Sequence, residues 1–313
     1  MRTMRFFLSL LIIGTPSMLF ADIMQEQLPA GSKWYVHVDF EKMRDTEAGK
    51  PLYSWLQGEV FADIREDAGV DLEKEADRIT AFAAADDGLV ILLEGNISQA
   101  TQDKAMGLAA ASGGMDRLES GGATYYYVKN DRSTDAAAQD AGKEQRDFGI
   151  DSLQDGAYFS FAVKNKVIVT SSRAEMAALL AAGGTISGGK NQDGALLVLS
   201  ADRSLIQAGL NTNEVEEEMG WDSNILRNTD QLALLVADEA GKIAIQAQLL
   251  TAKKEMAESL GSIVRGLISL QIFNDDLDPK ISDFLQSTSV NVVDKILTLK
   301  LALDPALIVE VID

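Results

Sequence analysis

The sequence predicts an α+β protein made of two similar halves of antiparallel β-hairpins, with helices packed on one face of the sheet. Three observations support this prediction. Several short segments alternate between apolar and polar residues, as half-buried strands do. Pairs of such segments flank tight-turn residues, which is the pattern of hairpins. The run AADDGLVILLEG in the first half also aligns with VADEAGKIAIQAQ in the second with one gap. Hairpin connections make the sheet mostly antiparallel.

The first repeat is predicted to cover residues 22–185 and opens with a strand over residues 33–41. In this strand Trp34, Val36 and Val38 point to one side, while Tyr35, His37 and Asp39 point to the other. Helices are expected next, around residues 52–56 and 60–68, and then at 98–111 and 173–182. Hairpins are predicted for residues 79–85 with 89–94, 115–119 with 123–128, and 157–163 with 166–170.

Two helix starts in this half carry capping residues, and one long segment carries no periodicity. Ser98 is placed to cap the helix after it, and Ser172 with Glu175 forms the S-x-x-E pattern of a capping box. Residues 129–156 are polar and alanine-rich, so they are predicted to form a mobile insertion between strands.

The second repeat is predicted to cover residues 186–313 after a glycine-rich seam. Strands are expected at residues 195–200, 231–237, 242–250, 289–293 and 295–302. The helix after residue 251 places an apolar stripe at steps of three and four, formed by Met256, Leu260, Ile263, Leu267 and Leu270. Asp304 and Pro305 are the residue types that start a helix.

Residues 1–21 have the pattern of a Sec-type signal peptide. Arg2 and Arg5 precede a short apolar run that ends before Gly14 and Pro16, and cleavage is predicted after Ala21. The apolar run is shorter than the roughly 20 residues that a membrane span needs, so no stable span is expected after cleavage. The predicted location is the periplasm or the extracellular space. The chain has no cysteine, which excludes disulfides and a thioether-linked lipid anchor.

The charge balance is strongly acidic. The chain has 28 basic and 48 acidic residues, and removing the two arginines of residues 1–21 leaves 26 basic residues and a net charge of about −22. Such a surface repels phosphate backbones, so nucleic acid is not expected as a partner. The expected partner is a protein or a component of the cell envelope, and its identity and the oligomeric state are left open.

The segment Leu28-Pro29-Ala30-Gly31-Ser32-Lys33-Trp34-Tyr35-Val36-His37-Val38-Asp39, followed by a helix and the strand at Ile79-Thr80-Ala81, resembles an uncharacterised family of exported bacterial proteins. The resemblance implies a signal peptide and repeated strand and helix units. It implies no activity and transfers no functional residue. The tyrosine-rich strand at residues 123–128 is a departure from that family.

Binding residues are predicted at two places. His37 and Asp39 share a strand face, which suits an oriented imidazole or two ligands of a metal. Tyr125 and Tyr127 also share a strand face and form a possible aromatic binding face with that pair. The acidic cluster Asp275, Asp276 and Asp278 is a weak candidate site for Ca²⁺, although it lacks the glycine and terminal glutamate of an EF-hand. No other cofactor is expected.

No catalytic motif is complete. His37 is the only histidine, which excludes two-histidine zinc sites, and the G-x-S-x-G motif is absent. Residues 184–190 match G-x-x-x-x-G-K, but Asn191 replaces the required hydroxyl residue and no strand precedes the loop. The sequence therefore favours a non-enzymatic binding or envelope-associated protein. The alternatives are a periplasmic carrier or chaperone for an apolar ligand, and a hydrolase that uses carboxylates alone.

Overall fold

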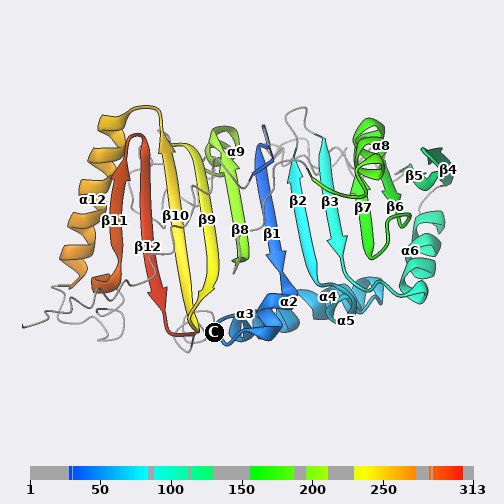
Figure 1. The fold of residues 1–313 in the computed structure, drawn as a ribbon, viewed down its shortest axis with the longest axis horizontal. Helices are drawn as coiled ribbons and strands as arrows, with labels where there is room; N and C mark the ends of the chain where they lie inside the picture. The colour runs from blue at the N-terminus through cyan, green and yellow to red at the C-terminus, as the bar shows by residue number, and fades with distance from the viewer. Residues whose placement is uncertain are drawn as a thin grey trace, which may run out of the picture.

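The strands form one antiparallel sheet of twelve, which runs the length of the molecule (Figure 1). The computed structural model describes residues 28–29, 31–83, 88–111, 114–129, 156–186, 195–210, 229–272, 282 and 285–305. The order across the sheet is β11-β12-β10-β9-β8-β1-β2-β3-β7-β6-β5-β4. The predicted α+β class and antiparallel sheet are confirmed. The signal peptide, Ala21 and most of the predicted insertion lie outside the described residues.

The strands are β1 (Trp34–Asp39), β2 (Arg78–Ala83), β3 (Leu89–Glu94), β4 (Met115–Ser120), β5 (Ala123–Val128), β6 (Ala157–Ser160), β7 (Lys166–Thr170), β8 (Ala195–Asp202), β9 (Thr229–Glu239), β10 (Lys242–Thr251), β11 (Ser289–Val293) and β12 (Ile296–Leu303). The helices are α2 (Phe40–Asp45), α3 (Gly49–Leu56), the π-helical η1 (Gln57–Phe61), α4 (Ala62–Ala68), α5 (Leu72–Glu75), α6 (Gln99–Ala111), α8 (Arg173–Ala181), α9 (Arg203–Leu210) and α12 (Lys254–Ile272).

The two predicted halves meet at the centre of the sheet, where β1 pairs with β8. Outward from this pair, the order β1-β2-β3-β7-β6 corresponds to the order β8-β9-β10-β12-β11. The hairpins whose sequences align, β2–β3 and β9–β10, occupy the same place in the two halves. The β4–β5 hairpin adds an edge to the first half alone. Duplication of the chain stays a prediction.

The two faces of β1 are buried to different depths. Tyr35, His37 and Asp39 define what we call the histidine face, and all three are buried. Trp34, Val36 and Val38 define the valine face, and these three are half-buried. The polar set of β1 is therefore the more deeply buried set, which is the reverse of the usual apolar-in pattern.

Helices contact both faces, so the predicted packing on one face is not shown. On the valine face, Phe40 and Met43 of α2 pack near Val38, and Leu260 of α12 packs against Leu249. On the histidine face, Met176 of α8 belongs to the cluster that contains Tyr35, Tyr125 and Ile168. Figure 1 shows α2 to α5 along the end of the sheet where β1 stops.

Two local predictions about helices need correction. In α12 the buried residues are Ala257, Leu260 and Gly261, whereas Leu270 of the predicted stripe is 70% exposed. The predicted stripe is thus covered unevenly: Met256 and Leu267 are half-buried, whereas Ile263 between them is 47% exposed. Ser172 precedes α8, but its side chain makes no capping hydrogen bond; its backbone carbonyl accepts from the Thr170 hydroxyl at 2.8 Å.

Candidate functional site

The histidine and aspartate predicted as a binding pair lie at the end of β1, in the middle of the sheet. His37 and Asp39 are each 1% exposed. His37 Nδ1 lies 2.8 Å from the Thr80 hydroxyl on the neighbouring strand β2. Both side chains are thus enclosed on the histidine face, and neither contributes open surface in this structure.

The Asp39 carboxylate has a structural role, because both of its oxygens are bound by neighbouring residues. One carboxylate oxygen accepts the backbone N–H of Lys42 at 2.9 Å, which caps the first turn of α2. The other accepts from Arg78 Nε at 3.2 Å and lies 3.4 Å from Lys42 Nζ. Arg78 in turn pairs with Glu41 at 2.5 Å. Asp39 therefore joins β1, α2 and β2 at one point.

Burial lowers the pKa of His37 below its usual 6.5, because the imidazolium loses hydration. The charges that face it partly cancel: Asp39 and Glu94 raise the pKa, whereas Lys42 and Arg78 lower it. The same buried core raises the pKa of Tyr35 to about 12, against a weaker opposing effect of its hydrogen bond to Thr80. Both shifts reflect the absence of open water at this end of the histidine face.

We expect stability to fall as the pH drops through 6.5 towards the lowered pKa of His37. In that pH range His37 is protonated in the unfolded chain but not in the folded chain. The free energy of unfolding therefore changes with pH by up to about 1.4 kcal/mol per pH unit. Urea unfolding measured between pH 5 and 8 tests this. Because His37 is the only histidine, the variant His37→Asn should lose the histidine part of the slope, and an unchanged slope would contradict the assignment.

The tyrosines of β5 are largely occupied by packing. Tyr125 is 1% exposed and its hydroxyl accepts from Arg173 Nε of α8 at 3.1 Å. Tyr127 is half-buried with its ring centroid 4.8 Å from that of Tyr158, while Tyr126 on the opposite face stacks on Phe159 at 5.3 Å. The predicted aromatic binding face stays a prediction, with Tyr127 as its least buried member.

The predicted calcium ligands Asp275, Asp276 and Asp278 lie outside the described residues. Within the described ranges, no group of three or more histidine, aspartate or glutamate side chains is placed to hold a metal ion. In the same ranges, no helix combines the length and apolar character of a membrane span.

An apolar hollow of about 440 Å³ lies on the valine face of the central strands. The residues that line it come from β1, β8, β9 and α9, and they are Trp34, Tyr35, Val36, Leu199, Ser200, Ala201, Leu205, Leu232 and Leu234. Ser200 and Tyr35 direct their side chains to the histidine face, where Ser200 accepts from Gln231. The side chains that form the wall are therefore apolar. We call this feature the apolar hollow.

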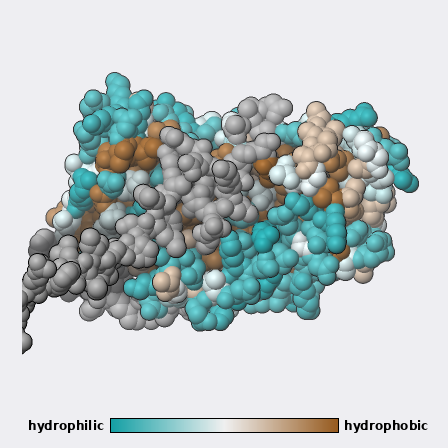
Figure 2. Space-filling model, in the orientation of Figure 1, coloured by the Kyte–Doolittle hydropathy of each residue, from teal (hydrophilic) through white to brown (hydrophobic). Residues whose placement is uncertain are grey.

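Strand register explains the wall of the apolar hollow. Val36 of β1 pairs with Leu199 of β8, and Leu199 pairs with Leu234 of β9. The three side chains form a row across the valine face, and each is half-buried. Hydrophobic patches are visible on the surface in Figure 2, above the hydrophilic band over α2 to α5.

Helix α9 closes one side of the apolar hollow. Asp202 at the end of β8 accepts the backbone N–H of Leu205 at 3.1 Å, which fixes the first turn of α9 against the strand. This turn places Leu205 on the lining. In the described part of the chain α9 contacts β8 and β9, two of the three strands that line the hollow.

The sequence carried a signal for this site that the strand predictions did not use. Strands β8 and β9 read ALLVLSAD and TDQLALLVADE, with near-continuous apolar runs where a strand with one wet face would alternate. Such runs are typical of strands covered on both faces. The sequence of these strands therefore indicates that their valine face, like their histidine face, is covered by apolar groups.

No protein-family model and no curated protein matches the chain. The chain is similar to crystal structures of TP0453, at 10% identity for crystal forms III and IV and 11% for form I. The alignments cover 91% of this chain and 94 to 96% of TP0453, with TM-scores of 0.43 to 0.44. This degree of likeness bears on neither the fold assignment nor the function. The resemblance of the segment at residues 28–39 to exported bacterial proteins also stays a prediction.

Proposed function

We propose that the chain is an exported, non-enzymatic carrier whose apolar hollow binds a small apolar ligand of the acyl-chain class. The observation that carries the proposal is the hollow itself: about 440 Å³, walled by apolar side chains, on strands whose sequence is apolar on both sides. Ligand pockets of proteins have volumes of about 300 to 1,000 Å³ and mostly apolar linings. Binding of a protein or an envelope component, expected from the sequence, stays a prediction.

The chemistry of the wall favours an apolar ligand over a polar one. No charged side chain belongs to the lining as described. A polar group entering the hollow would lose its hydration without a new hydrogen bond, which costs roughly 1 to 3 kcal/mol on protein scales. An alkyl segment gains about 0.8 kcal/mol for each methylene it removes from water.

Fluorescence of Trp34 tests the proposal, because this residue lines the hollow. The chain from residue 22 onward is titrated with dodecanoic acid carrying a terminal bromine, which quenches a tryptophan on contact. We expect saturable quenching that disappears in the variant Trp34→Phe. The two other tryptophans are Trp55, on α3, and Trp221, outside the described residues, and quenching that survives Trp34→Phe would count against the site.

A matched pair of substitutions locates the ligand. Leu199→Gln places a polar group in the hollow and should weaken binding about tenfold, since one leucine contact of 1.5 to 3 kcal/mol is lost in part. Ile91→Gln is the control: Ile91 is also half-buried on the valine face, but on β3, away from the lining. Equal loss in both variants, or no saturable quenching in the parent chain, would contradict the proposal.

A further inference from the structure

Gln246 on β10 is a buried amide whose hydrogen bonds are not made. Its side chain is 2% exposed, and neither Nε2 nor Oε1 has a hydrogen-bond partner within the described part of the chain. Buried polar groups are nearly always hydrogen-bonded, and leaving one unpaired costs about 1 to 3 kcal/mol. An amide with a free donor and a free acceptor calls for a ligand group that offers both.

Gln246 lines a hollow of about 160 Å³ on the histidine face, on the side of the sheet opposite the apolar hollow. Strand register sets it in a cross-strand row with Lys300 of β12 and Ser289 of β11. One row further along, Ala244 faces Ala302. Because these two side chains are only methyl groups, they leave an open space, and the longer side chains of the neighbouring rows surround it.

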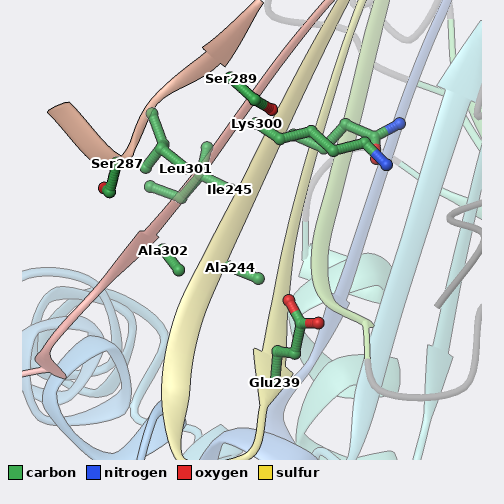
Figure 3. A pocket seen from close by; sticks show the side chains of 9 residues that line it. Glu239, Ala244, Ile245, Ser287, Ser289, Lys300, Leu301 and Ala302 are labelled. Carbon is green, nitrogen blue, oxygen red and sulfur yellow. The ribbon is translucent and has the colours of Figure 1, made fainter. Parts of the chain in front are cut away.

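The two ends of this hollow carry opposite charges. Figure 3 shows Lys300 and Ser289 at one end and the Glu239 carboxylate at the other, with Ala244 and Ala302 between them. Gln246 lies beside Lys300 in the same row. The lining thus presents an ammonium and an amide at one end, a carboxylate at the other, and a small apolar floor.

We propose that this hollow binds a dipeptide with small side chains. Its carboxylate lies against Lys300, Ser289 and Gln246 Nε2, its ammonium lies against Glu239, and its peptide N–H donates to Gln246 Oε1. The dipeptide supplies the donor and the acceptor that Gln246 lacks, and it places a charge of opposite sign at each end.

Length supports a dipeptide over a single amino acid. Glu239 lies four residues beyond Leu235, the β9 partner of Gln246, which is about 13 Å along a strand. Two extended residues span about 7 Å, and a charged hydrogen bond of about 2.8 Å at each terminus completes roughly the same distance. A free amino acid is shorter by one residue, or about 3.5 Å, and the side chains at the two ends would have to span that difference.

Calorimetric titration with L-alanyl-L-alanine, using the chain from residue 22, tests this proposal. We expect saturable binding of the dipeptide, and at least tenfold weaker binding of its N-acetylated form, its C-terminal amide and free alanine. Absence of binding at millimolar dipeptide would overturn the proposal. Equal binding of the blocked and unblocked forms would overturn the charge assignment on which it rests.

Two glutamines of the same strand give the matched variants. Gln246→Leu should weaken dipeptide binding at least tenfold without lowering the melting temperature, because the substitution removes an unpaired buried amide. Gln248→Leu changes the next residue on the same face, which is 5% exposed and outside the lining, and it should leave dipeptide affinity unchanged. If Gln246→Leu binds the dipeptide as the parent does, the proposal is wrong.

The outcome is independent of the proposed carrier function. Glu239→Gln should weaken binding of the dipeptide, whereas brominated dodecanoic acid should still quench Trp34, because the two hollows lie on opposite faces of the sheet. Leu199→Gln should do the reverse. Loss of both ligands in either variant would indicate a folding defect, which unfolding curves of the same preparations detect.

Discussion

Replacing Asp39 with alanine should lower the free energy of unfolding by about 2.5 to 4 kcal/mol, which combines a helix cap of roughly 1 kcal/mol with a charge-assisted hydrogen bond of roughly 1.5 to 3 kcal/mol. Asp39 is 1% exposed, caps α2 through Lys42 and pairs with Arg78. Its removal leaves an uncapped helix start and an arginine that keeps only an exposed partner. Urea unfolding at pH 7, followed by far-ultraviolet circular dichroism, measures the loss.

Two further variants separate the causes. Asp39→Asn keeps an oxygen that can cap α2 but loses the negative charge, so it should be destabilised less than Asp39→Ala. Glu41→Gln removes the other partner of Arg78, which is 48% exposed, and should cost less than about 1 kcal/mol. If Asp39→Ala costs no more than Glu41→Gln, the junction of β1, α2 and β2 does not depend on Asp39.

The hairpins could be predicted from the sequence because their signals are local. The pair Gly121-Gly122 between β4 and β5 adopts positive φ at both positions, 58° and 83°, as the turn residues indicated. Pairing within each hairpin follows directly from such turns. The β1–β8 pairing at the centre of the sheet joins segments about 160 residues apart in the chain, as the register shows, and no local signal specifies it.

Burial was harder to predict, because it depends on what lies over each face. Gln246 and Gln248 alternate with apolar residues in the run IAIQAQLL, yet both glutamines are buried on the histidine face. The alternation in β1 likewise gives the two faces but not their depth. A period of two assigns residues to sides, and only the tertiary structure decides which side is covered.

The two proposed binding sites differ in how far the sequence points to them. The sequence points to the apolar hollow through the near-continuous apolar runs of β8 and β9. Such runs are typical of strands that are covered on both faces. The dipeptide hollow joins Glu239 to Lys300 across β9, β10 and β12. These residues are about 60 positions apart, and only the register of three strands brings them to one place.

Replacing Gly95 with alanine should destabilise the first half of the sheet by at least about 3 kcal/mol. Gly95 follows β3 with φ at 152°, a conformation that residues with a Cβ rarely adopt. A Cβ there would overlap the backbone oxygen of Glu75 and lie 2.9 Å from the backbone N of Asp77. Both obstacles are backbone atoms, so no side chain can move aside to make room.

The position is demanding because three segments converge on it. The N–H of Gly95 donates to the carbonyl of Asn165 in the β6–β7 connection, and the N–H of Asp77 donates to Glu94. Moving Gly95 away from Glu75 would therefore break hydrogen bonds on both sides. Gly121→Ala is the control, since Gly121 also has positive φ, at 58°, but open space around it, and it should cost only about 1 kcal/mol. Equal unfolding midpoints for the two variants would contradict this prediction, because they would show that the close approach to Glu75 adds no cost beyond that of positive φ.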